Sequence, residues 1–125
     1  MVQTKWYKQK GDGEMINFRD KEYRCPVELT INLIGGKWKA VLLWELSKKT
    51  IRFNELTRLF PNATRKMLTQ QLKDMELNGL VLRKEYAQIP PKVEYSLTDF
   101  GKSFIPILMA MNQWGNDYLT ENYKN

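Results

Sequence analysis

The segment from Phe53 to Leu97 constrains the fold more tightly than any other part of the 125-residue chain. Its pattern predicts a helix, a short turn, a second helix and a two-stranded hairpin with Pro90-Pro91 at its tip. At about 100° per residue, the second helix, residues 65–78, has two distinct sides. Its apolar side consists of Leu68, Leu72 and Met75, and its polar side consists of Arg65, Lys66, Thr69, Gln70 and Lys73, with no acidic residue until Glu76.

Two further helices are expected before this segment. Pro26 suits the first position of a helix, because its missing N–H needs no partner there, and Gly35-Gly36 is expected to end that helix. The next helix, residues 37–47, is apolar on more than one side, which is typical of a helix at the centre of a core. Its tryptophans, Trp38 and Trp44, are therefore expected to pack rather than to bind a ligand.

The elements around the two-sided helix follow from local signals. Residues 51–53 are expected to be extended and to pair with the hairpin, and Asn54 is expected to cap the helix that follows. The inward-facing residues of that helix are expected to be Leu56, Leu59 and Phe60. Thr64 is the expected N-cap of the two-sided helix. In the hairpin, residues 80–87 and 92–97, the second strand alternates between apolar Val93, Tyr95 and Leu97 and polar Lys92, Glu94 and Ser96.

Composition excludes several classes of protein. The longest apolar run, Ala40 to Trp44, is far shorter than the roughly 20 residues that span a bilayer, so no membrane association is expected. The polar N-terminus lacks the apolar core of a signal peptide, which favours the cytoplasm. The chain has one cysteine and no histidine, which removes an intrachain disulfide, the usual metal ligand sets and histidine-activated nucleophiles. We therefore expect no enzyme, no metal and no cofactor.

The net charge of +6 is unevenly distributed along the chain. Residues 1–24, 25–63 and 64–97 each carry six basic side chains against four, three and four acidic ones. Residues 98–125 carry only two basic side chains against three acidic ones. This distribution fits a polyanionic partner for the middle of the chain and a different role for its end, although a basic soluble protein without such a partner would have a similar charge.

Four ordered blocks carry a family resemblance: CPVELTINLIGGKWK from Cys25, RFNEL from Arg52, KMLTQQLKDMELNGL from Lys66 and PPKVEYSLTDFGK from Pro90. With these blocks, residues 25–118 resemble the HxlR-type, MarR-like winged helix-turn-helix regulators. The resemblance implies a homodimeric, cytoplasmic transcriptional regulator of bacterial type. We predict an α+β, mainly helical fold with a two- or three-stranded wing sheet. Residues 1–24 form an arm of uncertain structure, and residues 25–125 form the winged-helix domain with a C-terminal dimerisation helix at 98–121.

The polar side of the 65–78 helix is the predicted contact with double-stranded DNA. Arg65 could bind guanine, Gln70 could bind adenine through two hydrogen bonds, and Lys66 and Thr69 share their side of the helix. Lys73, one turn further along, is expected to contact phosphate. A dimer would place two such helices about 34–36 Å apart on a pseudo-palindromic operator. The alternative is an ordinary solvated helix surface.

The hairpin supplies further candidate DNA contacts. Lys92, beside the proline tip, could reach phosphates or the minor groove. Arg83 and Lys84 point in opposite directions, so only one of them can share the exposed side of the wing, and Arg83 is retained as a candidate. The alternative is a charged sheet edge that discourages aggregation.

Cys25 is a candidate redox sensor. As the residue before Pro26 it would lie at the positive end of a helix dipole, with Arg24 and Lys21 nearby, an environment that favours a reactive thiolate. Some members of the resembled family sense oxidants or electrophiles through a cysteine at this position. Because the chain has no second thiol, oxidation could give an intersubunit disulfide, a mixed disulfide or an alkylated thiol. The alternative is a small buried apolar residue.

The last predicted helix has an apolar stripe that is long for so small a core. Thr98 is expected to cap it and Pro106 to kink it. Phe100 and Phe104 are expected to pack inside, whereas Met111, Trp114 and Tyr118 are expected to form a dimer interface. Two other functions stay open: a regulator switched by a small molecule in an aromatic pocket between this helix and the core, and a winged-helix module that binds protein.

Overall fold

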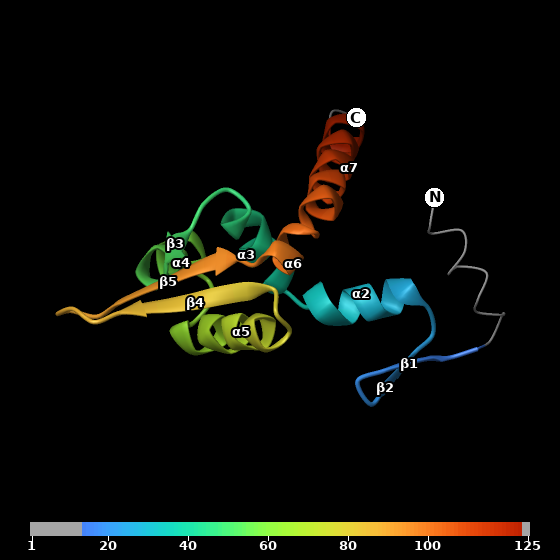
Figure 1. Cartoon of the computed structure of the whole chain (residues 1–125). Coiled ribbons are helices and arrows are strands. Elements are labelled where there is room, and N and C mark those ends of the chain that lie inside the picture. Colours follow the sequence, from blue (N-terminus) through green and yellow to red (C-terminus); the bar gives the residue numbers. More distant parts are fainter. Residues whose placement is uncertain (1–13, 124–125) are drawn as a thin grey trace. The chain divides into compact units, whose positions relative to one another are not determined.

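A computed structural model of the chain describes residues 14–123. These residues form two compact units that divide between Gly35 and Gly36 (Figure 1). The first unit contains a short hairpin and one helix, and the second contains the remaining helices and a three-stranded sheet. Each unit is described by itself.

The first unit begins with a hairpin that the sequence did not predict. Strands β1 (Ile16–Phe18) and β2 (Lys21–Tyr23) pair antiparallel. The two residues between them, Arg19 and Asp20, have φ values of 52° and 63°. Consecutive left-handed residues form the tight turn that joins two antiparallel strands, a turn usually signalled by Asn-Gly or Asp-Gly. Because neither dipeptide is present here, the sequence gave no signal for this hairpin, and residues 1–13 of the predicted arm lie outside the described residues.

Helix α2 (Pro26–Ile34) begins and ends where the sequence predicted. Pro26 occupies its first turn, and Cys25 precedes it in an extended conformation. At the other end Gly36 adopts the left-handed conformation, with φ of 85°. A side chain on the preceding Gly35 would collide with the carbonyl of Ile31, so this position also requires glycine.

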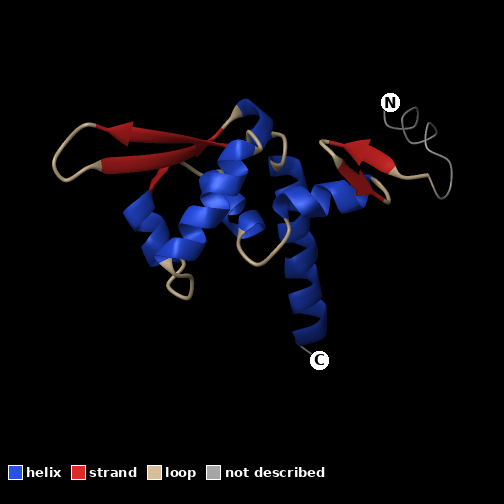
Figure 2. Ribbon diagram, turned by 90° about the horizontal axis from the view of Figure 1, so that it is seen from below, coloured by secondary structure: helices blue, strands red, loops and turns tan. Residues whose placement is uncertain are grey.

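The second unit surrounds its core with helices and a sheet (Figure 2). Its elements in chain order are α3 (Lys39–Leu46), β3 (Ile51–Arg52), α4 (Phe53–Leu59), α5 (Arg65–Leu77), β4 (Val81–Tyr86), β5 (Lys92–Leu97), α6 (Asp99–Lys102) and α7 (Ile105–Tyr123). The sheet is antiparallel in the order β3-β5-β4. The largest wholly buried side chains come from α3, β3, α4, α5, the residue before β4 and the first residue of β4: Leu42, Leu43, Ile51, Leu56, Leu68, Leu72, Met75, Leu80 and Val81.

This arrangement is the predicted winged helix-turn-helix. Helices α4 and α5 are joined by a short turn, and the β4–β5 hairpin extends beyond the helices in both views (Figures 1 and 2). Thr64 caps α5 by accepting a hydrogen bond from the Met67 N–H at 3.0 Å. The prediction for α4 was less accurate. Asn54 lies inside α4 rather than capping it, because the helix already begins at Phe53, and Leu59 is 44% exposed.

The C-terminal segment is two helices rather than one kinked helix. Thr98 caps α6, as predicted, by accepting from the Gly101 N–H at 2.8 Å, but α6 ends after one turn. Pro106 therefore stands at the second position of α7, where its missing N–H breaks no helical hydrogen bond. The prediction that both phenylalanines pack inside was half wrong, since Phe104 is buried whereas Phe100 is 54% exposed.

Candidate nucleic-acid interface

The two sides of α5 have the environments that its pattern predicted. Leu68, Leu72 and Met75 are wholly buried. The five side chains of the predicted DNA contact all lie at the surface of the second unit: Arg65, Lys66, Thr69, Gln70 and Lys73. Because the buried side fixes the rotation of the helix, the structure brings these five residues together on one exposed face, which we call the α5 face.

Arg65 is held at the junction between α4 and α5. Its guanidinium carbon lies 4.8 Å from the centre of the Phe53 ring, and its two terminal nitrogens are 3.4 Å from Oδ1 of Asn54. A cation over an aromatic ring is attracted to it and loses little of its hydration at an exposed site. Asn54, predicted as a helix cap, thus orients the first residue of the α5 face instead.

One acidic residue borders the α5 face and was missed by the sequence analysis. Asp74 accepts a hydrogen bond from the Gln70 amide at 3.1 Å and forms an ion pair with Lys39 at 3.6 Å. A helical wheel could have revealed it, because residues four apart lie on neighbouring positions of a helix. Gln70 would have to exchange this intrahelical partner for a base edge.

Lys92 takes part in a small network at the wing. Its ammonium lies 3.3 Å from Glu94 and 4.6 Å from the centre of the Tyr86 ring, while the Tyr86 hydroxyl donates to Glu94 at 2.9 Å. The pKa of Glu94 is lowered, above all by the Tyr86 hydrogen bond; burial, the next-largest cause, raises it, and Lys92 and Arg52 lower it further. The ammonium is therefore held in place over the outer side of the hairpin, paired but not enclosed.

Arg83 lies on the other side of the hairpin. It stands opposite Tyr95 in the strand register, whereas Lys84 stands opposite Glu94, so Lys84 shares the side of Lys92. Burial by itself would lower the pKa of Arg83, but the Tyr95 hydroxyl and Glu85, 3.2 Å away, raise it overall. The predicted alternation of Arg83 and Lys84 is thus confirmed, and the two basic candidates of the wing, Arg83 and Lys92, point to opposite sides of it.

The thiol of Cys25 is exposed at the start of α2. It makes no side-chain hydrogen bond as the cap of that helix. The first turn also contains Glu28, whose carboxylate accepts from the Arg24 N–H at 2.6 Å. Sequence reasoning considered the basic neighbours of the thiol and missed this acidic one, although a glutamate three positions after a helix cap is a common signal.

Helix α7 carries the three predicted interface residues on its surface. Met111, Trp114 and Tyr118 are exposed, Trp114 by 68%. The Trp114 and Tyr118 rings stack with centres 5.3 Å apart and an interplanar angle of 8°. This pair presents a flat aromatic surface, one turn long, on the exposed side of α7.

No candidate metal centre is present among residues 14–123. Within residues 14–123, Cys25 and the aspartate and glutamate side chains do not gather into a group of three or more that could hold a metal ion. Over the same residues, no helix combines the length and apolarity needed to cross a membrane.

The fold and the exposed α5 face define a helix-turn-helix transcriptional regulator of the winged, MarR-like type. A family model described as HxlR-like helix-turn-helix matches residues 33–123. The chain belongs to the HxlR-like helix-turn-helix family.

Named relatives agree with this assignment. Over 94 residues the chain is 50% identical to the uncharacterised HTH-type transcriptional regulator YdeP of Bacillus subtilis, covering 75% of this chain and 73% of that protein. It is 45% identical over 115 residues to YybR of the same organism, another uncharacterised HTH-type transcriptional regulator, covering 90% and 92%. A solved structure of the redox regulator HypR in its oxidised form matches with a TM-score of 0.71 and 49% identity, covering 74% of this chain and 96% of that one. YdeP and YybR are thus named as transcriptional regulators, and HypR is named as a redox regulator.

Proposed function

We propose that the protein is a cytoplasmic homodimer that regulates transcription by binding double-stranded DNA of a specific sequence. The observation that carries this proposal is the α5 face, five exposed polar side chains whose helix is fixed in rotation by its buried side. A helix of this kind fits the major groove, where base edges present distinct patterns of donors and acceptors. The β4–β5 hairpin, extending past the helices, supplies Lys92 and Arg83 as additional contacts to phosphates.

The residues of the α5 face have different roles in this proposal. Arg65 and Gln70 contact base edges, with Lys66 and Thr69 beside them, and Lys73 contacts phosphate. A base contact through two hydrogen bonds contributes about 1–3 kcal/mol of discrimination, whereas a phosphate contact strengthens binding to every sequence. A pseudo-palindromic operator follows from two such faces in a symmetric dimer.

The test measures binding of the full chain to a duplex from the region upstream of its own gene, against a scrambled duplex of equal composition. We expect Gln70→Ala to reduce the preference for the upstream duplex and Lys73→Ala to weaken both duplexes alike. Gln113→Ala is the matched control, because Gln113 donates to Asp117 as Gln70 donates to Asp74 but lies on α7. Equal losses on both duplexes from both α5 variants would contradict the assigned roles, and no binding to either duplex would favour the protein-binding alternative.

We further propose that Cys25 senses oxidants or electrophiles. Its thiol is exposed at the start of α2, and the similar protein HypR is a redox regulator. With one cysteine per chain, a disulfide would have to join two protomers or a protomer and a small thiol, and an electrophile such as a quinone would add to the sulfur directly. Each of these products attaches a new group to the sulfur of Cys25, directly before α2.

The sensing proposal is tested by the release of DNA on treatment with diamide or a quinone. We expect the native chain to release its duplex and the Cys25→Ser variant to retain it. Mass spectrometry of the intact, treated protein identifies the modification. Release that is unchanged in Cys25→Ser would refute sensing through this thiol while leaving the DNA-binding proposal intact.

A ligand-switched regulator is the second candidate function, favoured by a small apolar pocket in the second unit. The pocket has a volume of about 200 Å³ and lies between α3 and α7, with Val41, Trp44, Leu108 and Met111 among its lining residues. Trp44 is the one aromatic residue in its lining, so the pocket is less aromatic than predicted. A ligand there should quench tryptophan fluorescence, and the quenching should be lost in Trp44→Phe.

A further inference from the structure

A second pocket of the winged-helix unit differs in chemistry from the apolar one. It has a volume of about 370 Å³ and lies where the turn from α3 to β3, the end of β5 and the junction of α6 with α7 meet. Its volume is within the range of about 300–1,000 Å³ that is usual for small-molecule sites. The lining includes three lysines, Lys48, Lys49 and Lys102, and no acidic residue.

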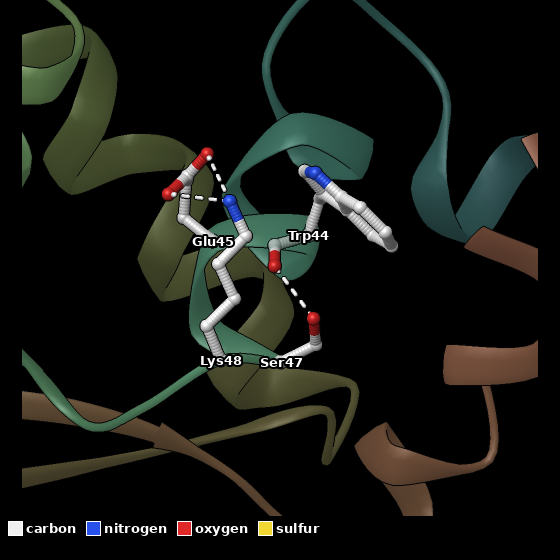
Figure 3. A network of polar contacts seen from close by, with 4 residues as sticks. All are labelled: Trp44, Glu45, Ser47 and Lys48. Carbon is white, nitrogen blue, oxygen red and sulfur yellow. Dashed lines mark hydrogen bonds and ion pairs between the residues drawn. The ribbon is translucent and has the colours of Figure 1, made fainter. Parts of the chain in front are cut away.

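The three lysines differ in how their charge is balanced. Lys48 folds back along the last turn of α3 to reach Glu45 at 3.4 Å (Figure 3), and Lys49 reaches Glu55 at 3.0 Å. Neither glutamate lines the pocket, and surface pairs of this kind are weak enough to rearrange around a ligand. Lys102 has no ion-pair partner among residues 14–123.

Hydroxyl groups and a helix dipole add to this basic lining. Ser47, Thr50 and Ser96 supply three hydroxyls, of which only Ser47 has a partner within the described residues, the Trp44 carbonyl at 2.6 Å. Ile105, the first residue of the 19-residue helix α7, also lines the pocket. The positive end of a helix dipole favours an anion there.

The remaining wall is apolar. It consists of Leu46 and Leu97, both buried, together with the side chain of Ile105. A free inorganic ion would leave this wall in contact with water. A molecule that joins a charged group to a small apolar body would cover it.

We propose that this pocket binds a small phosphate monoester with an apolar substituent. A phosphate monoester dianion carries two negative charges and three terminal acceptor oxygens, which match the three lysines and the hydroxyls of the pocket, and lysine binds phosphate as a point charge. A carboxylate offers one charge and two oxygens, so it would leave more of these donors unused. Lys102 is the principal cation of the site. Because the ligand would touch both the end of β5 and the start of α7, it would link the wing sheet to the helix proposed for dimerisation.

Calorimetry on the full chain tests the site with phenyl phosphate. The comparison ligands are phenol, which lacks the charged group, and benzoate, which has a carboxylate in place of the phosphate. We expect phenyl phosphate to bind at least tenfold more tightly than either comparison ligand. Lys102→Gln should weaken phenyl phosphate binding at least tenfold and Lys102→Arg much less. Lys84→Gln makes the same change of charge on the wing and should leave phenyl phosphate binding unchanged. All three variants should have the same melting temperature as the native chain. Equal losses from Lys102→Gln and Lys84→Gln would overturn the proposal.

Two further outcomes would contradict the site. If Lys73→Gln weakens phenyl phosphate binding and Lys102→Gln does not, the phosphate occupies the α5 face. If Lys102→Gln weakens binding to duplex DNA without affecting phenyl phosphate, Lys102 contacts the DNA backbone. The site itself does not require DNA binding, so a failure of the proposed regulatory function would leave the calorimetric result unchanged.

Discussion

At the scale of single residues, Thr98 connects more of the winged-helix unit than its size suggests. Its hydroxyl donates to the Gly79 carbonyl at 2.6 Å and accepts from the Gly101 N–H at 2.8 Å. One side chain thereby ties the turn after α5 to the first turn of α6. Gly101 completes this junction, since a side chain there would collide with the Leu80 carbonyl.

We predict that Thr98→Ala lowers the free energy of unfolding by about 1–2 kcal/mol, at the upper end for a lost helix cap, because the Gly79 carbonyl also loses a partner. Thr57→Ala is the control, since Thr57 bonds only to the Asn54 carbonyl of its own helix. The control should change stability by less than about 0.5 kcal/mol. Urea denaturation measures both, and equal effects would show that Thr98 acts as an ordinary helix residue.

The pKa of Glu94 provides a second prediction at this scale. The Tyr86 hydroxyl is the largest cause that holds this pKa below its ordinary value. A carboxyl with a lowered folded-state pKa stabilises the protein above its unfolded-state pKa and loses that contribution as the pH falls through the folded-state value. In Tyr86→Phe the pKa of Glu94 should rise towards the ordinary value, as followed by carbon-13 carboxyl shifts, while Lys84→Gln should leave it nearly unchanged. A Glu94 pKa that stays low in Tyr86→Phe would assign the shift to Lys92 instead.

At the scale of secondary-structure elements, the break between α6 and α7 changes the expected role of Pro106. Because Pro106 stands at the second position of α7, we predict that Pro106→Ala changes the free energy of unfolding by less than about 1 kcal/mol. Ala110→Pro, one turn further into the same helix, should lower it by about 3 kcal/mol or more and reduce helicity by circular dichroism. A clear gain of helicity in Pro106→Ala, from α6 joining α7, would mean that the proline itself maintains the break.

The elements also show which features the sequence could predict. Strong local signals predicted three features correctly: the start of α2 at Pro26, the cap of α5 at Thr64 and the strand β5 from its alternating pattern. The β1–β2 turn at Arg19-Asp20 lacks the usual turn residues, so it had no local signal. Pro106 did signal an interruption, but the signal was interpreted as a kink within one helix rather than as a break between α6 and α7.

The candidate site was predicted to a similar extent. Helical periodicity correctly assembled the α5 face, because burial of Leu68 and Leu72 determines the rotation of the helix. The partners of its side chains were not predictable in the same way. Arg65 meets Phe53 across a turn, and that contact depends on the angle between two helices.

At the scale of the whole molecule, the proposed dimer gives the exposed aromatic pair on α7 a function. A central buried aromatic residue commonly contributes about 2 kcal/mol or more to an interface. We predict that Trp114→Lys raises the dimer dissociation constant at least about 30-fold. Gln113→Lys, the neighbouring position of the same helix, should raise it much less. Sedimentation equilibrium measures both variants, and a native chain that is monomeric at micromolar concentration would refute the dimer.

The dependence of DNA binding on salt tests the α5 face and the dimer together. Each phosphate neutralised by a basic side chain contributes about 0.9 to the slope of log K against log salt. If Lys73 contacts phosphate and the bound form is a homodimer, Lys73→Ala should reduce the magnitude of the slope by about 1.8, one contribution from each protomer. Gln70→Ala removes no charge and should leave the slope unchanged while lowering the affinity for the preferred duplex. A reduction near 0.9 would indicate that only one Lys73 contacts the DNA, and an unchanged slope would remove Lys73 from the phosphate contacts.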